Sequence, residues 1–81
     1  MSKERQFDSF GRCLIYARQR RDMTAKQLSK VAGINESQIS HFETDKREPS
    51  AGNIRKLATA LDITADYLLG LSNETRRINE Y

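Results

Sequence analysis

Two helix-start patterns lie eleven residues apart near the middle of this chain, and their spacing constrains the fold more than any other feature. In each pattern a residue that can cap a helix, Thr24 or Asn35, is followed three positions later by a glutamine that can hydrogen-bond back to the cap. Gly33 lies between them, where a helix would give way to a turn. Two short helices joined by a glycine-containing turn of about three or four residues form a helix-turn-helix unit. The spacing predicts this unit at the centre of the chain.

Apolar residues at helical spacing predict three further helices around this unit, and no stretch alternates convincingly as a strand would. The first of them covers about residues 7–22. A polar turn follows the third helix and ends at Pro49, which prevents a helix from continuing through it. Ser50 can then cap the fourth helix. Thr64 can cap a fifth helix, which we expect to end at Gly70.

The predicted architecture is all-α, with one compact five-helix domain over residues 1–70. A chain of 81 residues has room for one such domain with one modest core. Three interpretations of residues 71–81 stay open: a tail or short extra helix, a dimerisation segment, or the start of a linker. Apolar pairs that flank a cap support three of the helix starts: Met23 with Leu28, Ile34 with Ile39, and Ile63 with Leu68.

The composition argues against several classes of protein. No apolar run approaches the roughly 20 residues that span a bilayer, and the charged N-terminus is unlike a signal peptide, so we expect a cytoplasmic location. The single cysteine, Cys13, cannot form an intramolecular disulfide and is expected to be an ordinary helix residue. His41 is the only histidine, so we expect no metal site and no cofactor. No nucleophile has a partner at motif spacing, and there is no glycine-rich phosphate loop, so an enzyme is not expected.

The net charge of +3 favours a polyanionic partner without requiring one. The whole excess lies in residues 1–23, which contain six positive and three negative side chains. Residues 24–49 and residues 50–81 each balance four positive against four negative side chains. A uniformly basic surface is therefore excluded, and any contact with nucleic acid must be made by selected residues on one face.

The third predicted helix has one polar face. At about 100° per residue, Ile39 and Phe42 point toward the core. Glu43 lies on the inward flank, where an unpaired carboxylate is costly, so it requires a cation, and the first helix offers several. Glu36 occupies the first turn, at the edge of the polar face. Three side chains that can make directed hydrogen bonds point outward: Ser37, Ser40 and His41.

This polar face has two interpretations. Hydrogen-bonding side chains on an exposed helix suit the reading of base edges in the major groove, where donors and acceptors distinguish all four base pairs. Alternatively, these side chains form an ordinary solvated helix face. The paired caps and the basic turn that follows the helix favour the first interpretation.

The stretch from Phe10 to Gly70, about three quarters of the chain, resembles the Cro/repressor-like, XRE-type helix-turn-helix family of prokaryotic and phage transcription regulators. The resemblance is carried by residues in every predicted helix: Phe10-Gly11-Arg12, Leu14 and Arg18; Met23-Thr24 and Leu28; Ala32-Gly33-Ile34; Ile39-Ser40 and Phe42-Glu43; Lys46-Arg47-Glu48-Pro49-Ser50; Leu57-Ala58 and Ala60-Leu61; and Asp66-Tyr67-Leu68-Leu69-Gly70.

The resemblance implies a five-helix bundle whose third helix is the recognition helix. It implies a transcriptional regulator, a repressor that binds a near-palindromic operator in double-stranded DNA as a homodimer. The residues expected to read bases are Glu36, Ser37, Ser40 and His41, with Ser40 reading either a base or a phosphate. The residues expected to bind phosphate are Thr24, Lys26, Asn35, Lys46 and Arg47. Arg18 and Glu43 correspond to the family's structural ion pair, which supplies the cation that Glu43 needs.

Three features depart from the family's usual pattern. The second helix has Ala25 at its first position, where glutamine is common, so Lys26 or the backbone amides near Thr24 must hold the phosphate. Asp45 stands where glycine is usual in the turn after the third helix. The third helix has neither Lys nor Arg, and Glu36 would repel phosphate unless it accepts a hydrogen bond from a cytosine amino group.

Two other functions stay open. The same scaffold can serve as a protein-interaction module, such as an antitoxin that neutralises a toxin or a partner-binding adaptor. The chain can also be the DNA-binding half of a longer regulator. No membrane or small-molecule partner is expected. We expect a homodimer surface on the fifth helix and the residues after it, with four candidates: Tyr67, Leu71, Ile78 and Tyr81.

Overall fold

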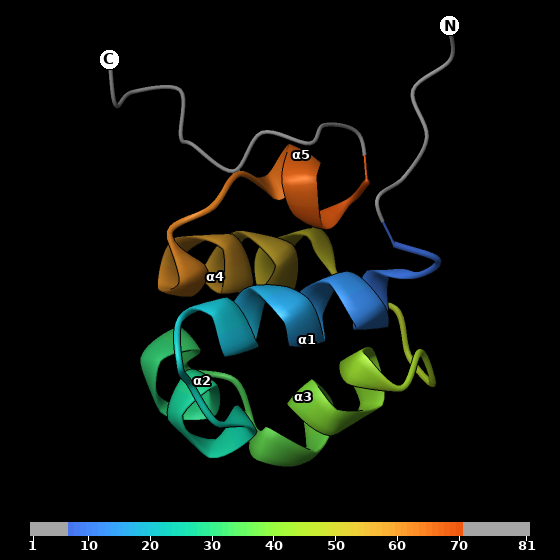
Figure 1. Ribbon diagram of the computed structural model, residues 1–81. Helices are drawn as coiled ribbons and strands as arrows, with labels where there is room; N and C mark the ends of the chain where they lie inside the picture. Colours follow the sequence, from blue (N-terminus) through green and yellow to red (C-terminus); the bar gives the residue numbers. More distant parts are fainter. Residues whose placement is uncertain (1–6, 71–81) are drawn as a thin grey trace, which may run out of the picture.

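The computed structural model describes residues 7–70, and within them it contains five helices and no strand. The helices are α1 (Phe10–Arg20), α2 (Ala25–Ala32), α3 (Glu36–Glu43), α4 (Ala51–Leu61) and α5 (Ala65–Leu68) (Figure 1). The prediction of an all-α fold with five helices is confirmed. Residues 71–81, with the candidate dimerisation residues Leu71, Ile78 and Tyr81, lie outside the described part of the chain.

A side-chain cap starts each of the five helices. Ser9, Thr24, Asn35, Ser50 and Thr64 each accept a hydrogen bond from a backbone N–H in the first turn that follows. Each bond satisfies a donor that a helix start leaves without an intrahelical partner. The sequence predicts four of these caps. The cap that it misses, Ser9, makes α1 begin three residues later than the predicted helix at residue 7.

All five helices are followed by a residue in the left-handed conformation: Asp22, Gly33, Asp45, Asp62 and Gly70, the residue at which the sequence predicts the end of the fifth helix. After the first four helices the next backbone N–H reaches back to a carbonyl in the last helical turn, as in a Schellman motif: Met23 to Arg18, Ile34 to Ser29, Lys46 to His41, and Ile63 to Ala58. The three aspartates have φ angles of 55°, 60° and 56°. Aspartate is one of the few residues that visit this region. These ends fix the direction in which the chain leaves each helix.

The helices enclose one core, whose fully buried side chains come from all five of them: Leu14, Leu28, Ile39, Leu57, Leu61 and Leu68. α3 packs against α1 and α2, while α4 contacts both α2 and α5. Figure 1 shows α2 and α3 together at one end of the molecule and α5 at the other. The helix-turn-helix unit therefore forms the surface opposite α5.

Tyr67 is a core residue, which corrects its place among the expected dimerisation residues. It is only 5% exposed, because its position on the short helix α5 faces α1 and α4. Cys13 is also buried, on α1, and its thiol donates to the Tyr67 carbonyl oxygen at 3.7 Å. Between residues 7 and 70, no helix is long and apolar enough to cross a membrane.

Candidate nucleic-acid interface

The exposed face of α3 carries the side chains that we expect to read DNA bases. Ile39 and Phe42 are buried in the core and fix which side of the helix faces outward. The four candidates form two pairs whose members are four positions apart, Glu36 with Ser40 and Ser37 with His41. Because residues four positions apart lie above one another on a helix, both pairs lie on the side of α3 that faces away from the core. Three of these side chains are exposed, Glu36, Ser37 and Ser40, and the fourth, His41, is half-buried.

The cap of α3 ties Asn35 to Ser37. Asn35 Oδ1 accepts the backbone N–H of Ser37 at 2.8 Å and the Ser37 hydroxyl at 2.7 Å. The predicted bond between the Gln38 side chain and the Asn35 backbone is absent among the described residues, and the asparagine oxygen accepts from the second residue of the helix. The Ser37 hydroxyl hydrogen is thus already used in a hydrogen bond, and the hydroxyl oxygen can act toward DNA only as an acceptor. The amide N–H groups of Asn35 have no partner within residues 7–70.

The start of α2 has a complete capping box. Thr24 Oγ1 accepts the backbone N–H of Gln27 at 3.0 Å, and Gln27 Oε1 accepts the backbone N–H of Thr24 at 2.8 Å. The N–H groups of Ala25 and Lys26 have no intrahelical partner, and the Lys26 side chain is exposed. This helix start therefore offers two backbone donors, the positive end of a helix dipole and one cation.

The turn after α3 presents two more cations. Lys46 and Arg47 are exposed, and their backbone N–H groups both donate to the His41 carbonyl oxygen, at 2.8 and 3.3 Å. Asp45 precedes them with φ 60°, in the place where the family usually has glycine. The turn is thus hydrogen-bonded to the last turn of α3, at the His41 carbonyl oxygen.

A largely buried ion pair joins α3 to α1. Arg18 Nε donates to Glu43 Oε2 at 2.7 Å, and Arg18 Nη2 donates to Glu43 Oε1 at 3.3 Å. Arg18 Nη1 donates to the carbonyl oxygen of Met23, the residue before the α2 cap, at 2.9 Å. The Arg18 and Glu43 side chains are 15% and 11% exposed. One guanidinium therefore connects α1, α3 and the start of α2.

Two other arginines, at the end of α1, are engaged elsewhere. Arg20 Nη1 donates to the Tyr16 hydroxyl at 3.0 Å, and this hydrogen bond raises the pKa of Arg20. Arg21 Nη2 lies 3.6 Å from Asp62 Oδ2, across a half-exposed pair. By contrast, the three cations that we expect to bind phosphate are exposed and have no carboxylate partner within the described residues: Lys26, Lys46 and Arg47.

Sequence reasoning misses one contact beside this interface. Asp45 Oδ1 accepts the backbone N–H of Gly11 at 3.0 Å, across 34 positions of sequence. A Cβ on Gly11 would lie 2.7 Å from the Phe42 carbonyl oxygen and closer still to that of Glu43, so only glycine allows α1 and α3 this close an approach. The one available signal is a glycine inside a helical pattern, which can mark such an approach.

Comparison with known proteins gives the family. The helix-turn-helix family HTH_3 matches residues 14–68. The HTH-type transcriptional regulator ImmR of Bacillus subtilis (strain 168) is 33% identical over 72 residues, which cover 89% of this chain and 56% of ImmR. The chain therefore spans just over half the length of that relative.

Solved structures share the fold. The restriction-modification controller protein C.AhdI from Aeromonas hydrophila is 36% identical with a TM-score of 0.71, covering 73% of this chain and 89% of its own. The P22 c2 repressor, solved with synthetic operator 9T, is 27% identical with a TM-score of 0.75, covering 82% of this chain and all of its own. These relatives agree with the expectation of a protein that is not an enzyme. The chain therefore belongs to the XRE-type, Cro/repressor-like helix-turn-helix family of DNA-binding transcription regulators.

Proposed function

We propose that this chain binds operator DNA sequence-specifically, as a homodimer, and represses transcription. The arrangement around α3 carries the proposal: a face of hydrogen-bonding side chains lies between two sources of positive potential, the start of α2 and the turn after α3. A helix fits the major groove, and contacts to phosphate on either side set its register. The P22 c2 repressor, which has a similar fold, was solved with a synthetic operator.

The α3 face favours particular bases. At the N-terminal end of α3, the Glu36 carboxylate offers only acceptors, and the Ser37 hydroxyl already donates a hydrogen bond to Asn35. These two side chains therefore suit the amino groups of cytosine or adenine. Further along the helix, His41 can donate to or accept from a base, and Ser40 can do the same or bind a phosphate.

Phosphate contacts are proposed on both sides of α3. Before it, the exposed Lys26 acts together with the free amides of the α2 start and the Thr24 hydroxyl. The Asn35 amide group adds a neutral donor at the start of α3 itself. After it, Lys46 and Arg47 supply two positive charges from the turn. Base reading and backbone gripping are thus assigned to different residues.

The homodimer would place two α3 helices in successive major grooves, about 34–36 Å apart, on a near-palindromic operator. We place its interface at the end of α5 and in residues 71–81. Leu69, at the end of α5, supports this assignment because it is a large apolar side chain that is 42% exposed.

Fluorescence anisotropy with labelled random-sequence duplexes at two salt concentrations tests the proposal. A DNA-binding chain should bind more weakly at the higher salt concentration, because each phosphate contact releases counterions. Absence of salt-dependent binding would contradict the proposal and favour the protein-interaction module. Sedimentation of the chain with and without DNA then measures how many copies occupy one duplex.

A further inference from the structure

Asp45 is an unfavourable residue for a turn that binds phosphate. Its carboxylate lies beside Lys46 and Arg47 in sequence, where a negative charge opposes contact with DNA. Its φ of 60° would be adopted by glycine without the steric cost of a Cβ. Both effects act against aspartate here, so the side chain must make a contact that offsets them.

That contact is with the start of α1. Asp45 Oδ1 accepts the N–H of Gly11, which is the second residue of α1 and one of the donors without an intrahelical partner. Ser9 caps a different donor, the N–H of Arg12, at 3.2 Å. The positive end of the α1 dipole also favours a carboxylate at this point. Asp45 is therefore a second cap of α1, supplied from another part of the chain.

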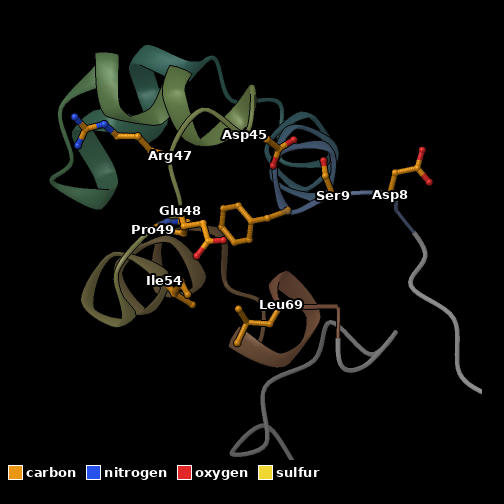
Figure 2. Close-up of a pocket in the computed structure, with 9 residues that line it drawn as sticks. Asp8, Ser9, Asp45, Arg47, Glu48, Pro49, Ile54 and Leu69 are labelled. Atoms are coloured by element: carbon orange, nitrogen blue, oxygen red, sulfur yellow. The ribbon is translucent and has the colours of Figure 1, made fainter.

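The same turn is attached to α3 by its backbone. The Asp45 N–H donates to the Phe42 carbonyl oxygen at 3.2 Å, and the next two N–H groups donate to that of His41. Figure 2 shows Asp45 turned toward Ser9 at the start of α1, while Arg47 extends from the turn in another direction. Both line a pocket of about 510 Å³ between the start of α1, this turn, α4 and α5. The turn thus has two attachments, one to each helix.

We propose that Asp45 is a positioning residue for DNA binding. By tying the turn to α1 as well as to α3, it fixes the direction in which Lys46 and Arg47 meet the phosphate backbone. This inference rests on the proposed function, because it assigns a means of orientation to two residues of that interface. It concerns a position where the family usually has no side chain at all.

The variant Asp45→Gly separates positioning from backbone geometry. Glycine accepts φ 60° without strain and removes a negative charge, so a purely geometric role predicts unchanged or tighter DNA binding. A positioning role predicts weaker binding, by roughly three- to tenfold, because the bond to Gly11 is lost. Asp45→Asn keeps an acceptor oxygen, tolerates the left-handed conformation and removes the charge, so it should bind at least as tightly as the wild type.

The measurement is anisotropy of the full 81-residue chain with a random-sequence duplex over a series of salt concentrations. Asp45→Gly should bind more weakly and flatten the log–log salt slope by about one unit, whereas Asp45→Asn should keep the slope. Asp62→Gly is the control for the backbone conformation, because Asp62 has φ 56° and the same charge but lies at the end of α4, where it forms a half-exposed pair with Arg21. It should leave the affinity and the slope unchanged.

A double-mutant cycle identifies the residue through which Asp45 acts. Lys46→Ala should weaken binding less in the Asp45→Gly background than in the wild type, because a misdirected lysine has less to lose. Affinities are scaled by the folded fraction from circular dichroism, so loss of folding is not mistaken for loss of positioning. Additive effects, or an Asp45→Gly variant that binds as tightly as the wild type, would overturn the role of Asp45. Wild-type chain without salt-dependent DNA binding would overturn the proposed function itself.

Discussion

Arg18 Nε lies 2.7 Å from Glu43 Oε2, in a pair of side chains almost enclosed between α1 and α3. The pair holds the inward side of the helix whose outward side carries the base-reading candidates. Because Arg18 also donates to the Met23 carbonyl oxygen, the same side chain fixes the start of α2. A partly buried pair of this kind is better understood as an orienting brace than as a large net source of stability.

Removal of the Glu43 carboxylate should destabilise the fold. Glu43→Ala leaves the Arg18 guanidinium with one of its three hydrogen bonds, so the free energy of unfolding should fall by about 1.5–3 kcal/mol in urea titrations. Arg21→Gln is the control, because the Arg21–Asp62 pair is half-exposed and 3.6 Å long, and should cost about 0–1 kcal/mol. Equal losses in the two variants would show that the brace has no special role.

A methyl group at Gly11 should push α1 and α3 apart. Gly11→Ala places a Cβ 2.7 Å from the Phe42 carbonyl oxygen, which cannot move without its helix, and should cost about 1–3 kcal/mol of unfolding free energy. Gly52→Ala is the matched control, because its Cβ would meet nothing closer than Ser50 Oγ at 3.8 Å. That change should stabilise the chain by about 0.4–1 kcal/mol. Thermal unfolding of both variants checks the opposite signs.

The capping box of α2 should respond to the loss of one oxygen atom. Thr24→Ala removes the acceptor for the Gln27 N–H and should lower the unfolding free energy by about 1 kcal/mol. Thr24→Ser keeps that acceptor and should be nearly neutral by the same measurement. A serine variant as unstable as the alanine variant would indicate that the threonine methyl group, rather than the cap, stabilises this helix start.

Charge in the turn after α3 should act on all DNA sequences alike. Lys46→Ala should weaken binding to every duplex by a similar factor and flatten the salt slope by about one unit. Lys56→Ala removes an exposed charge from α4, which carries none of the proposed contacts, and should change the slope less. A sequence-dependent loss in Lys46→Ala would instead place Lys46 at a base.

The helix starts and the outward face of α3 could be predicted because both depend on neighbouring residues. A cap acts within three positions, and the burial of Ile39 and Phe42 follows from a period of 3.6 residues. One detail was wrong at the start of α3, where the Gln38 side chain makes no bond back to the Asn35 cap of the kind that Gln27 makes with Thr24.

Contacts between distant segments could not be predicted. Phe7 fits the helical pattern of α1 but lies before the helix, where its ring packs against that of Tyr16 with the two centroids 4.8 Å apart. The sequence predicts the end of the first helix near Asp22 but not the left-handed conformation of that residue, and it predicts neither the end of α4 nor the left-handed conformation at Asp62. The bond from Asp45 to Gly11 joins residues 34 positions apart, so it exists only once α1 and α3 have packed.

Selection of duplexes from a random pool is the decisive experiment for base reading by α3, because it reports half-site sequence, spacing and symmetry together. We expect two near-palindromic half-sites with centres about 34–36 Å apart, each with an amino-bearing base opposite Glu36 and Ser37. We also expect His41→Ala to relax preference at one position per half-site and to lose about 1–3 kcal/mol there. A pool without an enriched sequence, or an unchanged sequence and affinity in His41→Ala, would contradict base reading by α3.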